Sequence, residues 1–198
     1  MKRLVLASNN PGKLREIGAL LGKLSIEVTP QGELGIAEAE EPHGTFLENA
    51  LAKARHASRI SRLPALADDS GLCVDALGGA PGVDSAYYAG RAGSREERDA
   101  RNNRKLLESI PDGERNAYYC CVMVLLRYPG DPRPLVAEGV WRGEIARAPR
   151  GANGFGYDPL FYLRELDQTA AELDPALKNR VSHRAQALQK LLLLVNEC

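Results

Sequence analysis

The distribution of apolar positions predicts a chain that begins with a strand, a helix and a second strand. Residues 2–8 form a short apolar stretch that is typical of a buried strand. Asn10 and Pro11 follow it, and these residue types favour the N-cap and the first position of a helix. Apolar side chains recur at helical spacing over residues 14–24, and a weaker strand pattern covers residues 26–29.

Two further helix starts share a signature, a hydroxyl residue followed three positions later by a glutamate. Thr45 with Glu48 and Ser94 with Glu97 both match this capping box. The first pair precedes apolar residues at helical spacing to about residue 60, and the second opens a charged stretch to about residue 110. We therefore expect one helix after each pair.

The second half of the chain contains two long strand patterns and a final helix. Residues 116–127 and 135–147 read as strands joined by a hairpin-like turn, and the centre of the first is apolar on both faces, as in a strand covered on both sides. Ser182 is expected to begin a last helix that runs to about residue 196. Because helices and strands alternate along the chain, the predicted class is α/β with a mixed sheet.

Composition narrows the functional classes. The chain has 198 residues, enough for one domain or two closely joined lobes, and its formal net charge of +0 argues against broad binding to nucleic acid or to an anionic membrane. No apolar run approaches the roughly 20 residues of a membrane span, and the apolar start is too short for a signal peptide. The four cysteines contain no Cys-x-x-Cys pair, so we expect reduced thiols in a cytoplasmic protein: Cys73, Cys120, Cys121 and Cys198.

The most informative motif is Asp68-Asp69-Ser70, which follows an apolar stretch. Acids at the end of a buried strand are costly unless a cation neutralises them, so a metal ion or a proton-transfer task would explain them. Mg²⁺ uses oxygen ligands and often only one or two protein carboxylates, and Glu40 or Glu41 could supply another. The alternative is a solvated acidic turn in which Asp69 or Ser70 caps backbone groups.

The first strand-to-helix turn suggests a phosphate site. Backbone N–H groups at such a turn can hold phosphate, and Lys13 places a cation where the helix dipole is already positive. An anionic ligand would turn this misfit into a favourable interaction. The turn is not a P-loop, because Ala7 and Leu14 stand where that motif requires Gly and Ser or Thr. The alternative is an exposed lysine on an ordinary helix.

The start of the last helix also places cations where the helix dipole is already positive. His183 and Arg184 follow the expected N-cap Ser182, and Lys178 comes shortly before it. A triphosphate shared by both helix starts would explain the two clusters of cations together. The alternative is that Arg184 pairs with an acid and that His183 is structural.

Residues 154–159, Gly-Phe-Gly-Tyr-Asp-Pro, form a loop in which aromatic residues alternate with glycines. Such a loop suits a nucleobase stacked on a ring with backbone groups at its edge. The alternative is that Phe155 and Tyr157 fill the core.

Taken together, these segments resemble the inosine triphosphate pyrophosphatases, also called non-canonical purine NTP pyrophosphatases or XTP/dITP diphosphatases. The resemblance covers nearly the whole chain, and six motifs in this order make it specific. The matching segments are SNNPGK at 8–13, TFLENA at 45–50, ADDSGL at 67–72, LGGAPGV at 77–83, GFGYDP at 154–159 and SHRAQA at 182–187.

The resemblance implies a fold, a reaction and a partner. The fold would be a single α/β domain over residues 1–198, an elongated two-lobed structure with a central mixed sheet flanked by helices and a cleft between the lobes. The reaction would be Mg²⁺-dependent hydrolysis of ITP, dITP and XTP to the monophosphate and pyrophosphate, which cleanses the nucleotide pool. The protein would be a homodimer. Two rival functions are a pyrophosphatase for another nucleotide, such as a modified pyrimidine, and a nucleotide sensor without hydrolysis.

The resemblance also implies residue roles. Asp69 would be the catalytic acid–base and a metal ligand, with Asp68 beside it and Glu41 or Glu40 as the second metal carboxylate. His183 and Arg184 would read the purine O6, whereas their electrostatic setting places them near a phosphate. The complete set of implied substrate contacts is Ser8, Asn9, Asn10, Pro11, Gly12, Lys13 and Lys53 at the phosphates, Ser70, then Phe155, Gly156, Tyr157, Asp158, Lys178, His183 and Arg184 around the base.

Overall fold

The computed structural model describes residues 3–22, 26–111 and 113–196. The parts of the predictions that fall on Lys2, Leu24 and Cys198 lie outside these residues. The strands are β1 Arg3–Leu6, β2 Glu27–Pro30, β3 Ala65–Val74, β4 Asn116–Leu126, β5 Leu135–Ile145, β6 Phe161–Leu163 and β7 Gln168–Thr169. The α-helices are α1 Pro11–Leu21, α2 Phe46–Ser61, α3 Arg95–Ser109, α4 Pro175–Val181 and α5 His183–Asn196.

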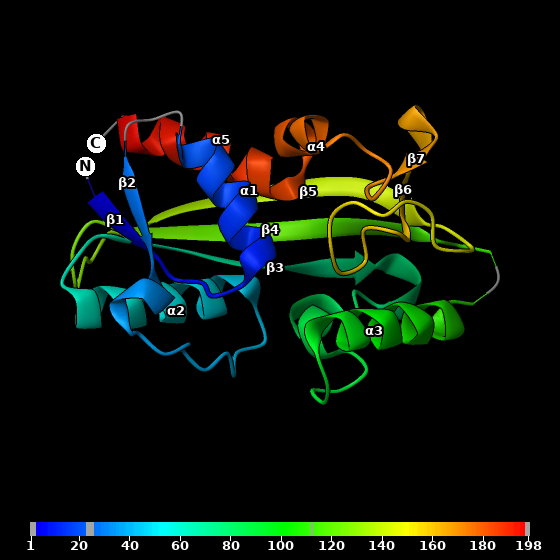
Figure 1. The fold of residues 1–198 in the computed structure, drawn as a ribbon, viewed down its shortest axis with the longest axis horizontal. Coiled ribbons are helices and arrows are strands. Elements are labelled where there is room, and N and C mark those ends of the chain that lie inside the picture. Colours follow the sequence, from blue (N-terminus) through cyan, green and yellow to red (C-terminus); the bar gives the residue numbers. More distant parts are fainter. Residues whose placement is uncertain (1–2, 23–25, 112, 197–198) are drawn as a thin grey trace. The chain divides into compact units, whose positions relative to one another are not determined.

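Within the described residues, seven strands form one mixed sheet in the order β2-β1-β3-β4-β5-β6-β7 (Figure 1). Strand β1 pairs in parallel with β2 and β3, whereas β6 pairs antiparallel with β5 and β7. The predicted α/β class with a mixed sheet is confirmed. The short strands β6 and β7 and the helix α4 were not predicted, because each is too brief to show a periodic pattern.

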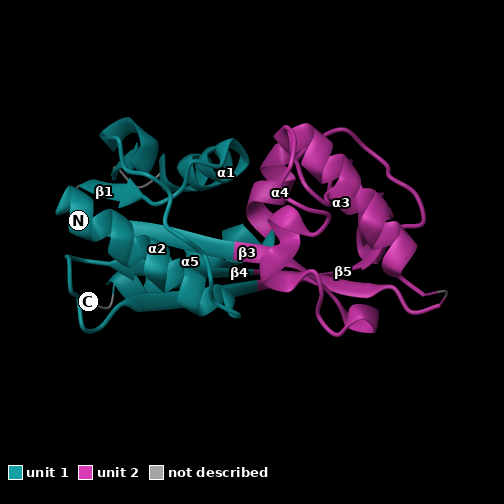
Figure 2. Ribbon diagram, turned by 90° about the horizontal axis from the view of Figure 1, so that it is seen from below, with its two compact units in different colours: residues 1–69, 121–139, 182–198 teal, residues 70–120, 140–181 magenta. Residues whose placement is uncertain are grey.

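The chain divides into two compact units (Figure 2). Unit 1 comprises residues 1–69, 121–139 and 182–198, and unit 2 comprises residues 70–120 and 140–181. The boundary falls within β3, between β4 residues 120 and 121, and within β5. Each unit has its own apolar core and is described separately below.

Helices cover both faces of the strands in unit 1 (Figure 1). Helices α1 and α5 pack on one face, where Ile17, Leu21 and Leu188 meet the strand residues Leu66 and Met123 in a single buried cluster. Helix α2 lies on the opposite face and contacts β1. Its inward positions are the fully buried alanines Ala50, Ala54 and Ala57, and such small side chains allow a close approach to the sheet.

An aromatic cluster forms the core of unit 2. The ring of Phe161 lies 4.6 Å from that of Tyr119 and 5.1 Å from that of Trp141, centroid to centroid. Leu106 of α3 and Ile110, the residue that caps its C-terminus, pack against the same cluster. Aromatic pairs at these separations contribute favourable edge and offset contacts in addition to the apolar area that they bury.

The helix starts bear out most of the capping predictions. Asn10 is the N-cap of α1, with Pro11 at the first helical position, and Ser94 and Glu97 form the complete capping box of α3. The box predicted for α2 is incomplete. Thr45 accepts the Glu48 N–H, but its hydroxyl donates to the Glu48 carboxylate at 2.7 Å, so the glutamate bonds the side chain of Thr45 and not its backbone N–H.

None of the described helices is both long and apolar enough to cross a lipid bilayer.

The turn between β4 and β5 depends on one buried carboxylate. Asp131 accepts hydrogen bonds from the Arg127 guanidinium at 2.8 Å, from the Arg127 N–H at 3.1 Å and from the Arg133 N–H at 2.9 Å. The side-chain hydrogen bond from Arg127 is the main reason that the pKa of Asp131 lies well below its ordinary value, although burial opposes the shift. The hairpin is therefore stabilised by an ionised carboxylate.

We expect Asp131→Ala to lower the free energy of unfolding by about 1–3 kcal/mol, because it removes hydrogen bonds to a charged group. A carboxylate with a lowered folded pKa stabilises the protein above its unfolded pKa of about 4 and loses that contribution as the pH falls below it. Urea unfolding at pH 7 and at pH 3 should therefore show a smaller difference between wild type and variant at pH 3. Arg133→Ala is the matched control, because Arg133 engages Asp131 only through its backbone N–H. An equal difference at both pH values would contradict the ionised role of Asp131.

Candidate active site

The two adjacent acids lie inside a continuous strand. Strand β3 runs unbroken from Ala65 to Val74, so Asp68 and Asp69 lie in its middle and not at its end as predicted, and the alternative of a solvated acidic turn is wrong. Both are buried, with 1% and 5% of their surface exposed. Neighbouring side chains of a strand point to opposite faces, and Leu66, two residues before Asp68, packs with α1 and α5. Asp68 accordingly meets cations from α1 and α5, and Asp69 meets a cation from α2.

Asp68 is neutralised by two cations on its face of the sheet. Its Oδ2 atom lies 2.8 Å from Lys13 Nζ and 3.5 Å from Arg184 Nε. Arg184 also pairs with Glu16 of α1 at 2.6 Å, so charges alternate in sign from Glu16 to Lys13. Burial alone would raise the pKa of Asp68, but Lys13, Arg184 and Lys53 outweigh it, and the pKa lies far below the ordinary value. Asp68 is therefore ionised.

Asp69 has a different environment on the opposite face. Its Oδ1 atom lies 3.0 Å from Lys53 Nζ, and its Oδ2 atom accepts a 3.3 Å hydrogen bond from Asn49 Nδ2. Burial raises the pKa of Asp69, the attraction of Lys53 and Lys13 opposes this, and Glu41 adds to the rise. The pKa of Lys53 is raised as well, because its neighbouring carboxylates outweigh the opposing effect of burial. Two adjacent carboxyl groups thus have pKa shifts of opposite sign.

The structure separates the two glutamates proposed as metal ligands. Glu41 Oε2 lies 3.1 Å from the same Lys53 Nζ that contacts Asp69, whereas Glu40 is exposed and, among the described residues, makes no ion pair with this cluster. Two carboxylates thus converge on one cation. Their oxygen donors fit Mg²⁺, which commonly uses one or two carboxylates and completes its shell with phosphate and water. The described residues contain no cluster of three or more His, Cys, Asp or Glu side chains suited to a metal.

The strand-to-helix turn is arranged differently from a backbone phosphate cradle. Asn10 Oδ1 accepts hydrogen bonds from the N–H groups of Gly12 and Lys13, at 3.0 and 3.2 Å, so the side chain already caps these donors. Ser8 Oγ accepts the N–H of Asn10 at 3.2 Å. Asn9 is exposed, and its side chain lies against Gly32. Among these residues, the ammonium of Lys13 is the group that the cap leaves available to an anion.

The start of α5 is closely packed against β5. His183 and Arg184 are buried, with 2% and 5% of their surface exposed, and Ser182 Oγ accepts the N–H of Ala185 at 3.4 Å. A Cβ atom on Gly139 of β5 would lie 2.0 Å from the His183 carbonyl oxygen. Glycine at this position therefore permits the approach that brings Arg184 to Asp68.

In unit 2, Asp158 organises residues 154–159, which we call the aromatic loop. Its Oδ2 atom accepts the Phe155 N–H at 2.8 Å and pairs with Lys178 Nζ at 2.6 Å. Gly154 has a φ of +78°, and a Cβ there would clash with Asp158. Lys178 and Asp158 are thus bound to one another in this structure, and Lys178 is 5% exposed.

The two aromatic residues of this loop have different settings. Tyr157 belongs to the apolar core of unit 2 and donates its hydroxyl to the Ser85 carbonyl at 2.8 Å, as the core-filling alternative predicted. Phe155 is half-buried and outside that core cluster. The Arg95 guanidinium lies 4.7 Å and Lys178 Nζ 5.2 Å from the centroid of its ring. Only Phe155 keeps the partial exposure that stacking on a ligand requires.

Sequence reasoning missed several residues of these clusters. Asn49 precedes Lys53 by one helical turn, and this i,i+4 spacing was the available signal that both point toward Asp69. Glu16 was missed because nothing near it in sequence indicates its partner Arg184, which lies 168 positions away. The residues of α3 around the aromatic loop were missed for the same reason.

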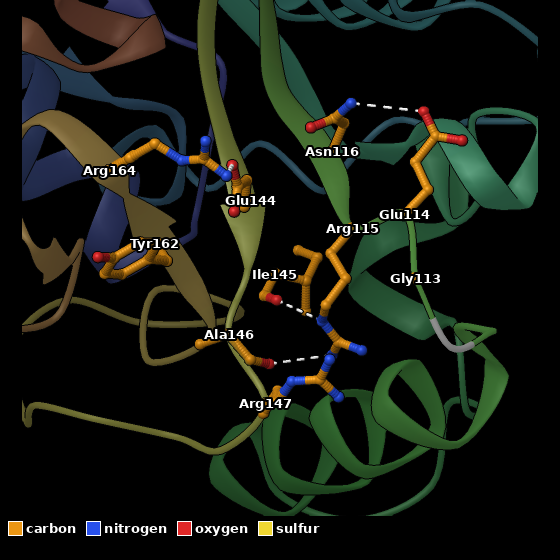
Figure 3. Close-up of a pocket in the computed structure, with 10 residues that line it drawn as sticks. All are labelled: Gly113, Glu114, Arg115, Asn116, Glu144, Ile145, Ala146, Arg147, Tyr162 and Arg164. Carbon is orange, nitrogen blue, oxygen red and sulfur yellow. Dashed lines mark hydrogen bonds and ion pairs between the residues drawn. The ribbon is translucent and has the colours of Figure 1, made fainter.

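A separate cavity in unit 2 contains none of the predicted site residues. Its volume is about 380 Å³, and Figure 3 shows its lining at the ends of β4, β5 and β6. Arg115 donates to the carbonyl groups of Ile145 and Ala146, and Arg164 pairs with Glu144. These arginines are engaged in holding strand ends.

The fold and the site define a class: an α/β enzyme with two adjacent buried acids on one strand, each paired with a lysine from a covering helix. The model of the Ham1 family matches residues 4–194. The dITP/XTP pyrophosphatase of Burkholderia pseudomallei is 63% identical over 98% of this chain and 94% of its own, and that of Ralstonia nicotianae is 62% identical over 97% and 96%. The chain belongs to the Ham1 family, which confirms the family resemblance seen in the sequence.

Solved structures agree with this assignment. A HAM1 protein from Coxiella burnetii is 50% identical, with a TM-score of 0.90 over 100% of both chains. The nucleoside-triphosphatase, or dITP/XTP pyrophosphatase, of Mycobacterium abscessus is 43% identical, with a TM-score of 0.72 over 96% of this chain and 98% of its own.

We expect Arg184→Ala to lower the free energy of unfolding by about 3–5 kcal/mol, because it leaves Glu16 and part of the charge of Asp68 uncompensated in a buried setting. Urea denaturation measures the change. Arg180→Ala is the matched control, since Arg180 is an exposed arginine of α4. A loss below about 1 kcal/mol would mean that the Arg184 network contributes little to stability, the value typical of exposed pairs.

Proposed function

We propose that this enzyme hydrolyses the deaminated purine nucleotides dITP, ITP and XTP to the monophosphate and pyrophosphate, and so removes them before polymerases use them. The names of its relatives support the reaction. The observation that carries the proposal is the pair of buried carboxylates on β3, each matched by a lysine from a different helix. Such a charged cluster is costly in a protein interior unless a function requires it.

Asp69 is the proposed general base. The side chain of Asp68 is 0% exposed and bound to Lys13, whereas that of Asp69 is 7% exposed, so water reaches Asp69 more readily. Asp69 Oδ1 remains on Lys53, and Oδ2, which among the described residues accepts the long hydrogen bond from Asn49, takes the proton. The water oxygen bonds to the α-phosphorus, and the bond from that phosphorus to the bridging oxygen breaks. Pyrophosphate leaves with the electron pair.

Asp68 would serve the electrostatics of the site. It fixes the ammonium of Lys13, whose side chain is 13% exposed, in a position to face a phosphate. The positive charges of Lys13 and Lys53 then stabilise the negative charge that develops on the leaving pyrophosphate. Because Asp68 is itself bound by cations, it does not compete for the proton of the water.

Asp69 and Glu41 would hold Mg²⁺, since their carboxylates already converge on a cation at Lys53. The metal would supply positive charge that neutralises the phosphate oxygens and withdraws electrons from phosphorus. We favour Glu41 over Glu40 as the second ligand of the metal, because Glu41 contacts Lys53 beside Asp69.

Phe155 is the proposed stacking surface for the base, with Gly156, Tyr157 and Asp158 shaping the loop beneath it. In unit 2, Lys178 would donate to the 6-oxo group that hypoxanthine and xanthine carry, a role that the family resemblance also gives to His183 and Arg184. Adenine presents an amino donor there, and a buried donor left facing another donor costs ~1–3 kcal/mol. Guanine shares the 6-oxo group, so its rejection requires a contact with its 2-amino group.

We further propose that the protein is a single domain over residues 1–198, forms a homodimer and is located in the cytoplasm. The domain and the homodimer rest on the family resemblance, and the location rests on the cysteine pattern. Light scattering during size-exclusion chromatography measures the oligomeric state directly.

The first experiment incubates the purified protein with dITP, ITP, XTP, dATP and dGTP, with and without Mg²⁺, and measures pyrophosphate and orthophosphate separately. We expect pyrophosphate from the deaminated purines only, and only with Mg²⁺. Asp69→Asn should retain the fold and lose on the order of 10³-fold in turnover. Asp75→Asn is the matched control, because Asp75 is an exposed acid directly after β3.

Each rival function has its own outcome in this experiment. Orthophosphate release, or equal rates on dATP and dGTP, would contradict the proposed reaction or selectivity. Nucleotide binding without release of pyrophosphate would identify a sensor.

The glutamate pair tests the metal site. We expect Glu41→Gln to raise the Mg²⁺ concentration for half-maximal activity by about tenfold, because it removes one anionic ligand. Glu40→Gln makes the same chemical change one residue away and should leave this concentration within twofold. A Mg²⁺ titration at saturating dITP measures both. The reverse ranking of the two variants would assign the ligand to Glu40.

A further inference from the structure

One face of α3 contacts the aromatic loop. Arg95, Asp99 and Asn103 recur every four residues and therefore lie on one face of this helix. Asp99 Oδ2 accepts the N–H of Gly156 at 3.0 Å, and Asn103 Nδ2 donates to the Gly156 carbonyl at 3.0 Å. Both backbone polar groups of one loop residue are thus bound by two side chains one helical turn apart.

These contacts hold a residue that has no side chain of its own to pack. Gly156 has a φ of +64°, a left-handed conformation that favours glycine, and a Cβ there would meet nothing within 4 Å. Its backbone conformation determines the direction in which the chain leaves Phe155. The two hydrogen bonds from α3 therefore restrain the peptide that follows the proposed stacking ring.

The same helix face also contacts the ring. Arg95 lies 3.8 Å from Asp99 and places its guanidinium 4.7 Å from the centroid of Phe155. Arg95 and Asp99 are about one quarter exposed, so this ion pair contributes little to stability by itself. Its geometric effect is to link the orientation of the ring to Asp99.

We propose that Asp99 and Asn103 are positioning residues for the nucleobase. They act through Gly156 to set the plane of Phe155, and so control the affinity for the purine without touching the reacting phosphates. This inference rests on the proposed function of Phe155 as the stacking surface. It predicts a change in KM and in selectivity between purines, with kcat preserved.

Two pairs of substitutions distinguish the effect of losing a hydrogen bond from the effect of a smaller side chain. Asp99→Asn keeps an oxygen that accepts the Gly156 N–H, whereas Asp99→Ala removes it. Asn103→Asp keeps the size but sets a carboxylate against the Gly156 carbonyl, and Asn103→Ala leaves that carbonyl without its donor. If the two residues were merely structural, the effects of the variants would rank with side-chain size or helix stability. If they position the loop, the effects rank with the loss of the hydrogen bonds to Gly156.

Hydrogen exchange tests the positioning without requiring activity. We expect the amide of Gly156 to exchange about tenfold faster in Asp99→Ala than in wild type, and less than threefold faster in Asp99→Asn. Ser94→Ala is the control, because it removes the cap of α3 and destabilises the helix without touching the loop. Unchanged protection in Asp99→Ala, or equal loss in Ser94→Ala, would overturn the positioning role.

Steady-state kinetics on dITP and dATP tests the consequence. Asp99→Ala, Asn103→Ala and Asn103→Asp should raise KM for dITP by about five- to tenfold, the effect of one lost hydrogen bond, with kcat within threefold. The preference for dITP over dATP should fall by the same factor. Faster exchange with unchanged KM would overturn the role in base binding. A wild type that releases no pyrophosphate from dITP refutes the proposed function, whereas the exchange measurement still decides the positioning.

Discussion

Neutralisation of two adjacent carboxylates inside a strand is the constraint on which unit 1 depends. Asp68 and Asp69 have almost no access to water, so their charge must be balanced by groups that the fold delivers. Alternation along β3 directs them to opposite faces, and each face supplies a lysine from the helix that covers it. The strand, α1, α2 and α5 are therefore held by charge matching as well as by apolar packing. Loss of any one cation would leave a buried negative charge less compensated.

This arrangement gives two chemically identical side chains different properties. Asp68 is surrounded by cations on its own face and is held ionised, whereas Asp69 shares one lysine with Glu41, and its pKa is raised by burial. A pair of carboxyl groups with separated pKa values is the arrangement by which many enzymes divide electrostatic and proton-transfer roles. Here the separation originates in which helix lies over which face.

Local signals in the sequence located most elements but not the partners of the charged residues. Asn10, Ser94 and the long apolar strands act through neighbours a few positions away, so their patterns predicted α1, α3, β4 and β5 correctly. The acids of β3 were expected at the end of the strand and lie in its middle, and the lysines that balance them come from distant segments. The pairing of Glu16 with Arg184 and of Asp99 with Gly156 depends on contacts between residues far apart in the chain. No local pattern encodes them.

The bare backbone of Gly139 has a consequence for how this charge balance can vary among related proteins. Because the His183 carbonyl would lie 2.0 Å from any side-chain carbon at position 139, even a methyl group would displace the first turn of α5. That turn carries Arg184, and a shift would draw its guanidinium away from Asp68. Gly139, which carries no charge, thus helps to set the distance between the Arg184 guanidinium and the Asp68 carboxylate. A side chain at position 139 would therefore weaken one of the two cation contacts that Asp68 makes among the described residues and leave Lys13 as the other partner.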